Sequence, residues 1–337
     1  MNLSTLVREG VAHIAQLPPR NWRDIATTRF LSVPLIAEDY PAKTAAMWNA
    51  AYAALDMPDR NMMLVADPKD LDQIMSALRA DPRYQGGGAG IGFKEAVLPY
   101  LDDMTPLARA MGAVNIIKKD SHGRLVGDNT DGAGYAQSLE EALVGNGIAM
   151  KDARILMLGA GGSGRAIAFA LADRGARLVI LNRTEAKARE LSETLNRYFG
   201  RTVASGGARE LLPSVLVETD AIVSVIDDAV SPLDAYSTIG VMELPVTRES
   251  IERNRIDTEH LLEKLSRTVI ISDIRIRKGP TAMLSQAKEL GFRTLDGIPM
   301  VVNQGIEAFR WLYSAISLPR GAGQADMARV MHAAAAA

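Results

Sequence analysis

The sequence predicts an α/β fold in two domains, one of which is built on a doubly wound parallel sheet. The chain has 337 residues, enough to form two hydrophobic cores. Apolar runs typical of strands alternate with amphipathic segments typical of helices, which is the order of α/β layers. A glycine motif stands between one such run and the helical segment after it. In a doubly wound sheet, a nucleotide binds at such a position.

The glycine motif belongs to a complete strand–helix–strand unit. The apolar run Ile155–Leu158 is followed without a gap by Gly-x-Gly-x-x-Gly. Gly159 allows the tight turn, Gly161 lets the backbone approach a pyrophosphate, and Gly164 lets the next helix pack close to the strand. The N-terminus of that helix then faces the anion. Arg177–Leu181 forms the second strand of the unit. We expect a dinucleotide site; the alternative is a glycine turn that serves backbone geometry alone.

The residues after the second strand indicate which dinucleotide binds. An NAD site usually places Asp or Glu there to hold the ribose 2′-hydroxyl. This chain has Asn182-Arg183-Thr184, followed by Lys187 and Arg189. An acid would repel a 2′-phosphate, whereas an arginine can bind it through two hydrogen bonds. The sequence therefore predicts NADP, and the alternative is that these cations are only solvated charges at the start of a helix.

Composition excludes several other classes of protein. Hydrophobic residues make up 47% of the chain, and the formal net charge of −2 provides no general field for nucleic acid or a membrane surface. The absence of cysteine excludes disulfides, thiolate metal sites and cysteine nucleophiles, and the four histidines lie too far apart to suggest a metal site. The first 30 residues lack a signal-peptide core, and no apolar run approaches the roughly 20 residues that span a bilayer. We expect a cytoplasmic protein with a small-molecule partner, and a homodimer stays open.

The first third of the chain alternates between helical and strand-like patterns. Residues 1–28 have a partial apolar stripe and are expected to be helical until Pro18-Pro19. Residues 29–33 form a probable first strand, residues 42–55 a helix and residues 62–65 a second strand. Asp67-Pro68 then begins another helix, with the aspartate or its neighbour as cap.

A second glycine-rich stretch occupies residues 86–95. It lacks the preceding strand of a phosphate loop, so we interpret it as close backbone approach to another element or a ligand, ending in a lysine that starts a helix. Residues 112–117 are expected to form a strand, and His122-Gly123 a hairpin turn. Further strands are expected at 221–225 and 268–274.

Five sequence blocks, in this order, resemble the shikimate dehydrogenase family, which includes quinate/shikimate dehydrogenases. They are Phe93–Glu95, Gly112–Asn115, Gly123–Gly134, the glycine motif with Asn182–Thr184, and Met300–Gly305. The resemblance extends from residue 30 to about residue 315. It implies an α/β substrate domain over 1–131, a Rossmann NADP domain over 132–296, and C-terminal helices over 297–337 that return to the substrate domain, with a cleft between the domains.

The resemblance also implies the site residues. Lys94 and Asp131 match the catalytic pair, which removes the alcohol proton as hydride leaves for the nicotinamide; a purely structural ion pair is the alternative. The substrate positions are Asn115, Thr130 and Gln304, with Glu38 and Tyr40 at the carboxylate anchor. The cofactor positions are Gly159, Gly161, Gly162, Gly164, Asn182, Arg183, Thr184, Lys187 and Met300, and no metal is implied.

This chain departs from the family pattern at positions that hold the substrate. The family's Ser-x-Ser carboxylate anchor is replaced by Glu38-Asp39-Tyr40, and a tyrosine expected after Asp273 is replaced by Ile276. Two further differences are a threonine and a proline replaced by Gly90 and Gly92, and an Asn-Ala-Thr segment replaced by Ser224-Val225-Ile226. We therefore predict an NADP-dependent oxidoreductase acting on a small cyclic hydroxy compound that need not be shikimate. The alternatives are a methylenetetrahydrofolate-type dehydrogenase and a non-catalytic NADP-binding sensor.

Overall fold

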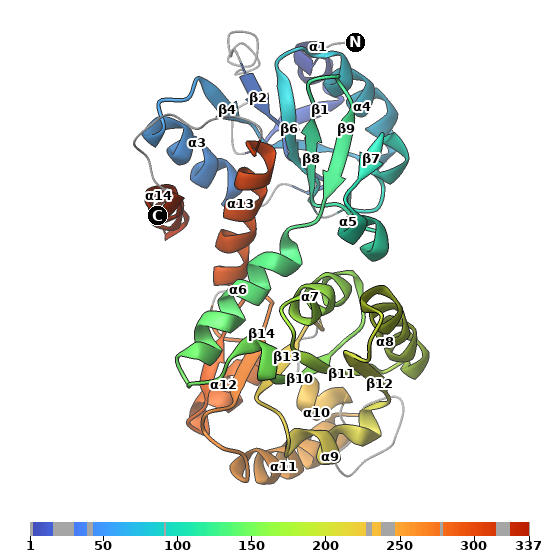
Figure 1. The fold of residues 1–337 in the computed structure, drawn as a ribbon, viewed down its shortest axis with the longest axis vertical. Helices are drawn as coiled ribbons and strands as arrows, with labels where there is room; N and C mark the ends of the chain where they lie inside the picture. The colour runs from blue at the N-terminus through green and yellow to red at the C-terminus, as the bar shows by residue number, and fades with distance from the viewer. Residues whose placement is uncertain are drawn as a thin grey trace. The chain divides into compact units, whose positions relative to one another are not determined.

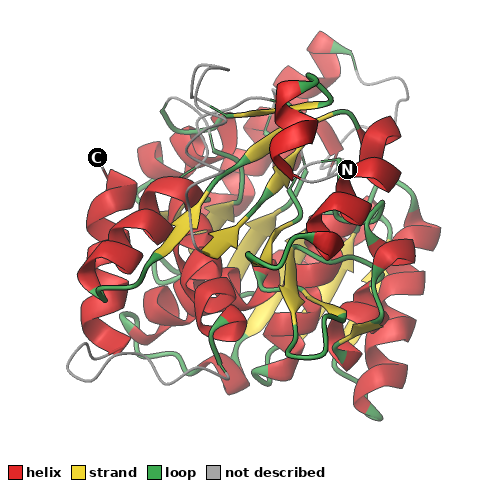
Figure 2. Cartoon of the chain, turned by 90° about the horizontal axis from the view of Figure 1, so that it is seen from above, coloured by secondary structure: helices red, strands yellow, loops and turns green. Residues whose placement is uncertain are grey.

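The computed structural model describes residues 3–15, 30–38, 43–90, 92–226, 231–236, 247–276, 279–314 and 324–336. The chain divides into two compact units: unit 1 is Met1–Thr130 with Val302–Ala337, and unit 2 is Asp131–Val301. Both helices and strands make up the structure (Figure 2), so the expected α/β class is confirmed. Among the described residues, no helix is long and apolar enough to cross a membrane.

Unit 2 alternates strands with helices in chain order. Its strands are β10 (Arg154–Leu158), β11 (Arg177–Leu181), β12 (Ala204–Gly207), β13 (Ala221–Ser224), β14 (Ile270–Asp273) and β15 (Arg293–Leu295). Its helices are α6 (Asp131–Val144), α7 (Gly162–Asp173), α8 (Glu185–Phe199), α9 (Leu212–Leu216), α10 (Pro232–Tyr236), α11 (Arg248–Glu263) and α12 (Ala282–Glu289). The 3₁₀ turns are η4 (Met150–Asp152) and η5 (Arg209–Leu211), and α13 (Ile298–Leu312) begins in this unit.

The described strands of unit 2 form one parallel sheet in the order β12-β11-β10-β13-β14-β15. The strand order reverses between β10 and β13, which is the switch point where doubly wound sheets bind ligands. Helices α6 and α7 lie on one side of the sheet, and α10 and α11 on the other (Figure 1). Because both faces are covered, the central strands are almost continuously apolar: β13 is buried throughout, as is β10 after Arg154.

The described part of unit 1 contains two sheets. Its strands are β1 (Ala12–Ile14), β2 (Phe30–Ser32), β3 (Leu35–Ile36), β4 (Asp59–Asn61), β5 (Leu64–Ala66), β6 (Tyr84–Gly88), β7 (Asp103–Met104), β8 (Ile116–Lys119) and β9 (Leu125–Asp128). Its helices are α1 (Leu3–Arg8), α3 (Thr44–Ala54), α4 (Leu71–Ala80), α5 (Pro106–Met111), most of α13 and α14 (Gln324–Ala336), with 3₁₀ turns η2 (Pro68–Asp70) and η3 (Leu98–Tyr100). The larger sheet has the order β4-β2-β6-β8-β9-β7, and the smaller one β1-β5-β3.

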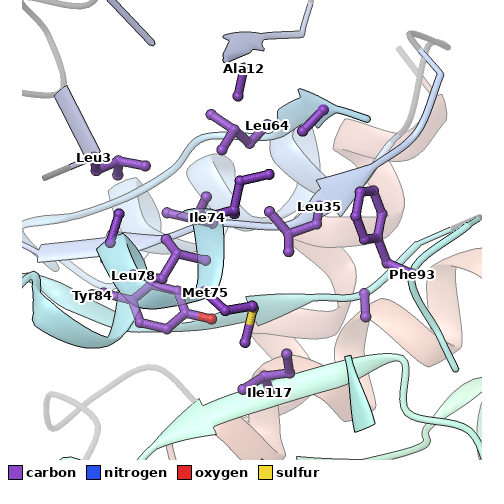
Figure 3. Close-up of a cluster of buried hydrophobic side chains, with 14 of the residues drawn as sticks. Leu3, Ala12, Leu35, Leu64, Ile74, Met75, Leu78, Tyr84, Phe93 and Ile117 are labelled. Atoms are coloured by element: carbon purple, nitrogen blue, oxygen red, sulfur yellow. The ribbon is translucent and has the colours of Figure 1, made fainter. Parts of the chain in front are cut away.

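The two faces of the larger sheet support separate cores. Successive residues of a strand point to opposite faces. On β8, Ile117 joins the core built with α1 and α4, which Figure 3 shows, whereas Ile116 joins the core built with α3, α13 and α14. The C-terminal helices α13 and α14 therefore complete unit 1 by covering the second face.

The expectation that residues 1–28 are helical is wrong for residues 9–15. Helix α1 ends at Arg8, and Gly10 adopts a φ of +77°, which favours glycine and breaks the helix. Ala12–Ile14 then form β1, which pairs antiparallel with β5. Residues 16–28, with Pro18-Pro19, lie outside the described part. A three-residue strand that depends on a partner 50 residues away leaves no periodic signal in the sequence.

The first three glycines of the glycine-rich stretch, Gly86–Gly88, belong to the central strand β6. The expected close backbone approach is confirmed: a Cβ on Gly87 would lie 2.1 Å from the carbonyl oxygen of Val33, and one on Gly86 would lie 2.2 Å from that of Ile117. The helix expected to start at Lys94 is wrong, because residues 92–97 form turns followed by η3. Pro99 lacks an amide proton and disfavours the helical conformation of the residue before it.

Most of the other expected elements are confirmed. They are the strands at 29–33 (β2), 62–65 (β5), 221–225 (β13) and 268–274 (β14), and the helices at 42–55 (α3) and after Asp67 (η2 and α4). The strand expected at 112–117 begins only at Ile116 as β8, because Gly112 ends α5 with a φ of +67°. Asp67 caps η2 by accepting the amide of Lys69. The hairpin is also confirmed, since β8 and β9 pair antiparallel and Gly123 adopts a φ of +77°.

Candidate functional site

The glycine turn lies at the carboxyl end of β10, at the switch point of the unit 2 sheet. Gly159 has a φ of +109°, and a Cβ there would lie 2.7 Å from Cγ2 of Val225. A Cβ on Gly164 would lie 2.9 Å from the same atom, so the start of α7 packs directly against the residue that follows β13. Both glycines are therefore required by packing.

The other two glycines of the turn face open space. A Cβ placed on Gly161 or Gly162 would have no atom within 4 Å. Gly161 is the N-cap of α7, no side chain caps this end, and the first turn contains no acid. The first amides of a helix carry partial positive charge and need acceptors. This turn therefore offers backbone donors, in an open space, to an anion such as a pyrophosphate.

Asn182 connects the glycine turn to the loop after β11. Its Oδ1 accepts the amide of Ala160 at 3.3 Å, and its Nδ2 donates to the carbonyl of Thr184 at 2.9 Å. Arg183, Thr184 and Lys187 lie beside it, at the surface or only partly buried. Within α8, which begins after Thr184, Arg189 makes an ion pair with Glu185 at 2.5 Å and so has a local role. Asn182 thus sets the distance between the anion-binding turn and the predicted 2′-phosphate side chains.

Unit 1 brings together three of the predicted substrate residues, although they come from distant parts of the sequence. Asn115 Nδ2 lies 3.1 Å from Thr130 Oγ1 and 3.2 Å from Gln304 Oε1. Asn115 Oδ1 accepts the amide of Thr130 at 2.8 Å, and Thr130 Oγ1 donates to the carbonyl of Gln304 at 3.1 Å. Amides and a hydroxyl both donate and accept, which suits the neutral hydroxyl groups of a ligand. We call this group the amide–hydroxyl cluster.

A buried tryptophan, which the sequence did not single out, holds the α13 side of this cluster. Trp48 on α3 donates its indole N–H to the carbonyl of Gly305 at 3.0 Å, and packs edge-on against Phe309. A Cβ on Gly305 would lie 2.8 Å from the end of Met47, so glycine is needed for this close approach. An aromatic residue on an apolar helix face is typical of a core, and no sequence pattern marked its hydrogen bond.

Each predicted catalytic residue is connected through its backbone to a residue of the amide–hydroxyl cluster or to that residue's neighbour. The carbonyl of Lys94 accepts the amide of Val114 at 2.9 Å, so the lysine backbone pairs with the segment that carries Asn115. The Lys94 side chain is half-buried. Asp131 is buried, directly follows Thr130 and is the first residue of α6. Lys94 belongs to unit 1 and Asp131 begins unit 2, and their partnership stays a prediction.

The remaining predicted residues occupy the ends of elements. Glu38 is exposed just after β3, and Tyr40 lies outside the described residues. Met300 is half-buried in the first turn of α13, and Ile276 is 56% exposed in the segment after β14. Asn129, which the sequence did not single out either, is buried and donates from Nδ2 to the carbonyl of Ala113 at 3.1 Å.

The chain is similar to known proteins over most of its length. The shikimate dehydrogenase substrate binding domain matches residues 40–117, and the shikimate / quinate 5-dehydrogenase domain matches residues 141–229. A shikimate dehydrogenase (NADP(+)) of Geobacillus kaustophilus (strain HTA426) is 35% identical over 272 residues, which cover 79% of this chain and 86% of that protein. This chain belongs to the shikimate dehydrogenase family. It is an oxidoreductase of that type, as the sequence blocks predicted.

Solved structures of this family show the same fold. Shikimate 5-dehydrogenase from Thermus thermophilus, in complex with NADP(H) and shikimate, is 26% identical, with a TM-score of 0.62 over 90% of this chain and 98% of its own. The 5-ketofructose reductase of Gluconobacter sp. strain CHM43 is 25% identical, with a TM-score of 0.66 over 91% of this chain and 99% of its own. The predicted Rossmann class is confirmed, and proteins of this fold are named for different substrates.

Proposed function

We propose that this protein is an NADP-dependent dehydrogenase that acts on the alcohol or ketone of a small cyclic hydroxy compound. The observation that carries the proposal is the convergence of Asn115, Thr130 and Gln304. Three neutral hydrogen-bonding groups, beside the segment paired with Lys94, suit a substrate with several hydroxyl groups. The substrate site belongs to unit 1 and the cofactor site to unit 2.

The cofactor is NADP. The open backbone of Gly161 and Gly162 at the start of α7 fits a pyrophosphate, and Gly159 and Gly164 supply the tight turn below it. The cofactor, when bound, supplies the hydride acceptor or donor of the reaction. Asn182 fixes the loop that carries Arg183, Thr184 and Lys187, which would hold the adenosine end of the cofactor. Met300 would contribute to the nicotinamide end. An arginine in place of an acid favours the 2′-phosphate of NADP.

Lys94 and Asp131 carry out the proton transfer. As hydride leaves the carbon of the alcohol, its hydroxyl proton must move to a base, and in ketone reduction the same group returns a proton to the oxygen. Lys94 Nζ is the group that exchanges this proton. Asp131 orients Lys94 Nζ and accepts a hydrogen bond from a neighbouring substrate hydroxyl, while the amide–hydroxyl cluster holds the remaining hydroxyl groups.

The preferred substrate lacks a carboxylate at the family's anchor position. Two serine hydroxyls can donate to a carboxylate, whereas an ionised Glu38 only accepts hydrogen bonds and repels a like charge. The similar 5-ketofructose reductase is named for a substrate without a carboxylate. We assign the protein to the cytoplasm, with a small molecule as its partner and with neither nucleic acid nor a membrane; a homodimer stays a prediction.

A substrate screen tests the proposal. NADPH oxidation is measured with keto sugars, keto inositols, dehydroshikimate and dehydroquinate, and NADP reduction with the matching alcohols. We expect turnover with an uncharged polyol or its ketone, and weak turnover with the carboxylated compounds that improves in Glu38→Ser. Ordinary turnover of shikimate that is unchanged in Glu38→Ser would refute the substrate assignment. Tight NADPH binding without turnover of any compound would favour the sensor alternative.

A further inference from the structure

The segment after β14 contains a buried ion pair that the proposed reaction does not use. Asp273, the last residue of β14, is 0% exposed, and the side chain of Arg275 is only 8% exposed. Arg275 Nη2 lies 2.6 Å from Asp273 Oδ2, and its Nε lies 3.1 Å from each carboxylate oxygen. The backbone amide of Arg275 also donates to Oδ1 at 3.2 Å. The chain thus folds back on itself within three residues.

A third residue completes this arrangement. Thr281, the N-cap of α12, donates its hydroxyl to Asp273 Oδ2 at 2.8 Å and accepts the amide of Leu284 at 3.4 Å. Both carboxylate oxygens therefore have donors, as a buried charge requires. The pair connects the end of the strand, the segment that follows it and the start of the next helix, and we call Asp273, Arg275 and Thr281 the β14 clamp.

The segment held by the clamp packs against a glycine. A Cβ on Gly297 would lie 1.9 Å from the carbonyl oxygen of Ile274 and 3.2 Å from Cγ1 of Ile276. Gly297 immediately precedes α13, whose first turn includes Met300. Residues 274–276 are therefore fixed on one side by the clamp and on the other by the backbone before α13.

The clamp lies at the ligand-binding edge of the sheet in unit 2. Asp273 is in register with Ser224 of β13, and Ser224 is in register with Leu158, the last residue before the glycine turn. The amide of Ile274 donates to the carbonyl of Ser224 at 3.1 Å. Carboxyl ends of parallel strands form the binding edge of doubly wound sheets, so residues 274–276 lie on that edge two strands from the turn.

We propose that Arg275 is a positioning residue, which acts through the β14 clamp to hold residues 274–276 at the reacting end of the cofactor site. Because Asp273 engages its guanidinium, Arg275 contributes no free charge there, and the segment presents the aliphatic side chain of Ile276. An uncharged wall suits a nicotinamide. This inference rests on the proposed function for its catalytic consequence, but the clamp itself can be tested without it.

The test compares three variants with the unmodified protein. Arg275→Met removes the clamp cation, Arg275→Lys keeps a charge without the planar fork, and the double variant Asp273→Asn/Arg275→Met removes both charges. The matched control is Arg255→Met on α11, which breaks the partly exposed ion pair with Glu259. Each protein is measured for melting temperature, for hydrogen exchange of the amides at 274–276, and for kcat and KM with NADPH and the substrate found in the screen.

A positioning role predicts a specific combination of results. In Arg275→Met, the amides at 274–276 should exchange hydrogen faster, and kcat/KM for NADPH should fall about tenfold. Arg275→Lys should give values between those of Arg275→Met and the unmodified protein. The double variant should regain thermal stability, because no unpaired charge is buried, but not kcat/KM. Unchanged exchange in Arg275→Met, or kinetics restored together with stability in the double variant, would overturn the inference. An unmodified protein that neither binds nor oxidises NADPH would instead contradict the proposed function. The hydrogen-exchange measurement would still show whether Arg275 holds residues 274–276 in place.

Discussion

At the scale of single residues, some residues of the site are needed for packing and others leave room for a ligand. Gly159 and Gly164 are required because a side chain would collide with Val225, whereas Gly161 and Gly162 leave room for a ligand. Arg183 and Arg189 differ in a similar way, since Arg189 pairs with Glu185 on its own helix, whereas Arg183 stands in the loop before it. Neighbouring residues of one type can therefore serve as controls for each other.

Arg183→Ala should reduce the preference for NADPH over NADH. The guanidinium binds a phosphate through charge-assisted hydrogen bonds, so the difference in binding free energy should shrink by about 1–3 kcal/mol. Titration calorimetry with both cofactors measures it. Arg189→Ala, which breaks a local ion pair within α8, should leave the preference intact. Equal affinities for both cofactors in the unmodified protein would contradict the assignment of NADP.

Lys94→Ala should slow the reaction without weakening cofactor binding. A positioned acid or base contributes about 10²–10⁴-fold to the rate, and kcat should fall by that factor. NADPH binding should stay within about twofold, because the glycine turn belongs to unit 2. Lys69→Ala, at an exposed lysine paired with Asp67, is the control. A Lys94→Ala protein with full turnover would assign this lysine to structure.

At the scale of elements, α3 determines where α13 presents Gln304. The four rings of Trp48, Tyr52, Phe309 and Tyr313 pack together where α3 meets α13, and Tyr313 donates its hydroxyl to the buried carboxylate of Asp59 at 2.8 Å. Burial raises the pKa of Asp59, although the hydrogen bond from Tyr313 opposes this effect. Aromatic packing thus fixes the position of α13 against α3, and the hydrogen bond from Trp48 to Gly305 fixes the turn of α13 that carries Gln304.

Trp48→Phe should disturb the amide–hydroxyl cluster while keeping most of the aromatic packing. It leaves the buried carbonyl of Gly305 without its indole donor, which should cost about 1–3 kcal/mol of stability. The KM for substrate should rise, and NADPH affinity should not change. Trp311→Phe on α13 is the matched control, because that ring lies beside Lys118 instead. Equal substrate KM values in Trp48→Phe and the unmodified enzyme would show that the hydrogen bond is not needed for the cluster.

The elements that could be predicted from the sequence are those whose signals are local. The β10–α7–β11 unit was predicted because its glycines and apolar runs satisfy local backbone and burial demands. Gln304 was found only through a family motif, since its partner Asn115 lies 189 positions away. Strand β1 and the β14 clamp were missed because a three-residue strand and an i,i+2 ion pair have no periodicity. Long-range pairing, and short local contacts that leave no periodic pattern, are therefore the parts that required the structure.

At the scale of the whole molecule, a buried carboxyl group in unit 2 makes stability depend on pH. Asp234 on α10 is 5% exposed, its carbonyl accepts Nδ2 of Asn254 on α11 at 2.7 Å, and Gln286 on α12 donates to its carboxylate at 3.4 Å. Burial raises the pKa of this carboxyl group from 3.8 to about 6, and the hydrogen bond from Gln286 offsets that effect only in part. Three helices of one unit thus meet at a carboxyl group that favours its protonated form.

Asp234→Asn should flatten the pH dependence of unfolding. Because the folded state binds this proton more tightly than the unfolded state does, the stability it contributes is complete below pH 3.8 and is lost as the pH rises through about 6. An asparagine resembles the neutral acid at every pH, so the variant should exceed the unmodified protein by about 1–3 kcal/mol at pH 8 and match it near pH 4. Urea unfolding at several pH values measures this, with Asp152→Asn at an exposed position as the control. If the two units unfold in separate transitions, only the transition of unit 2 should change in Asp234→Asn. Parallel plots of unfolding free energy against pH for Asp234→Asn and the unmodified protein would contradict a buried, protonated Asp234.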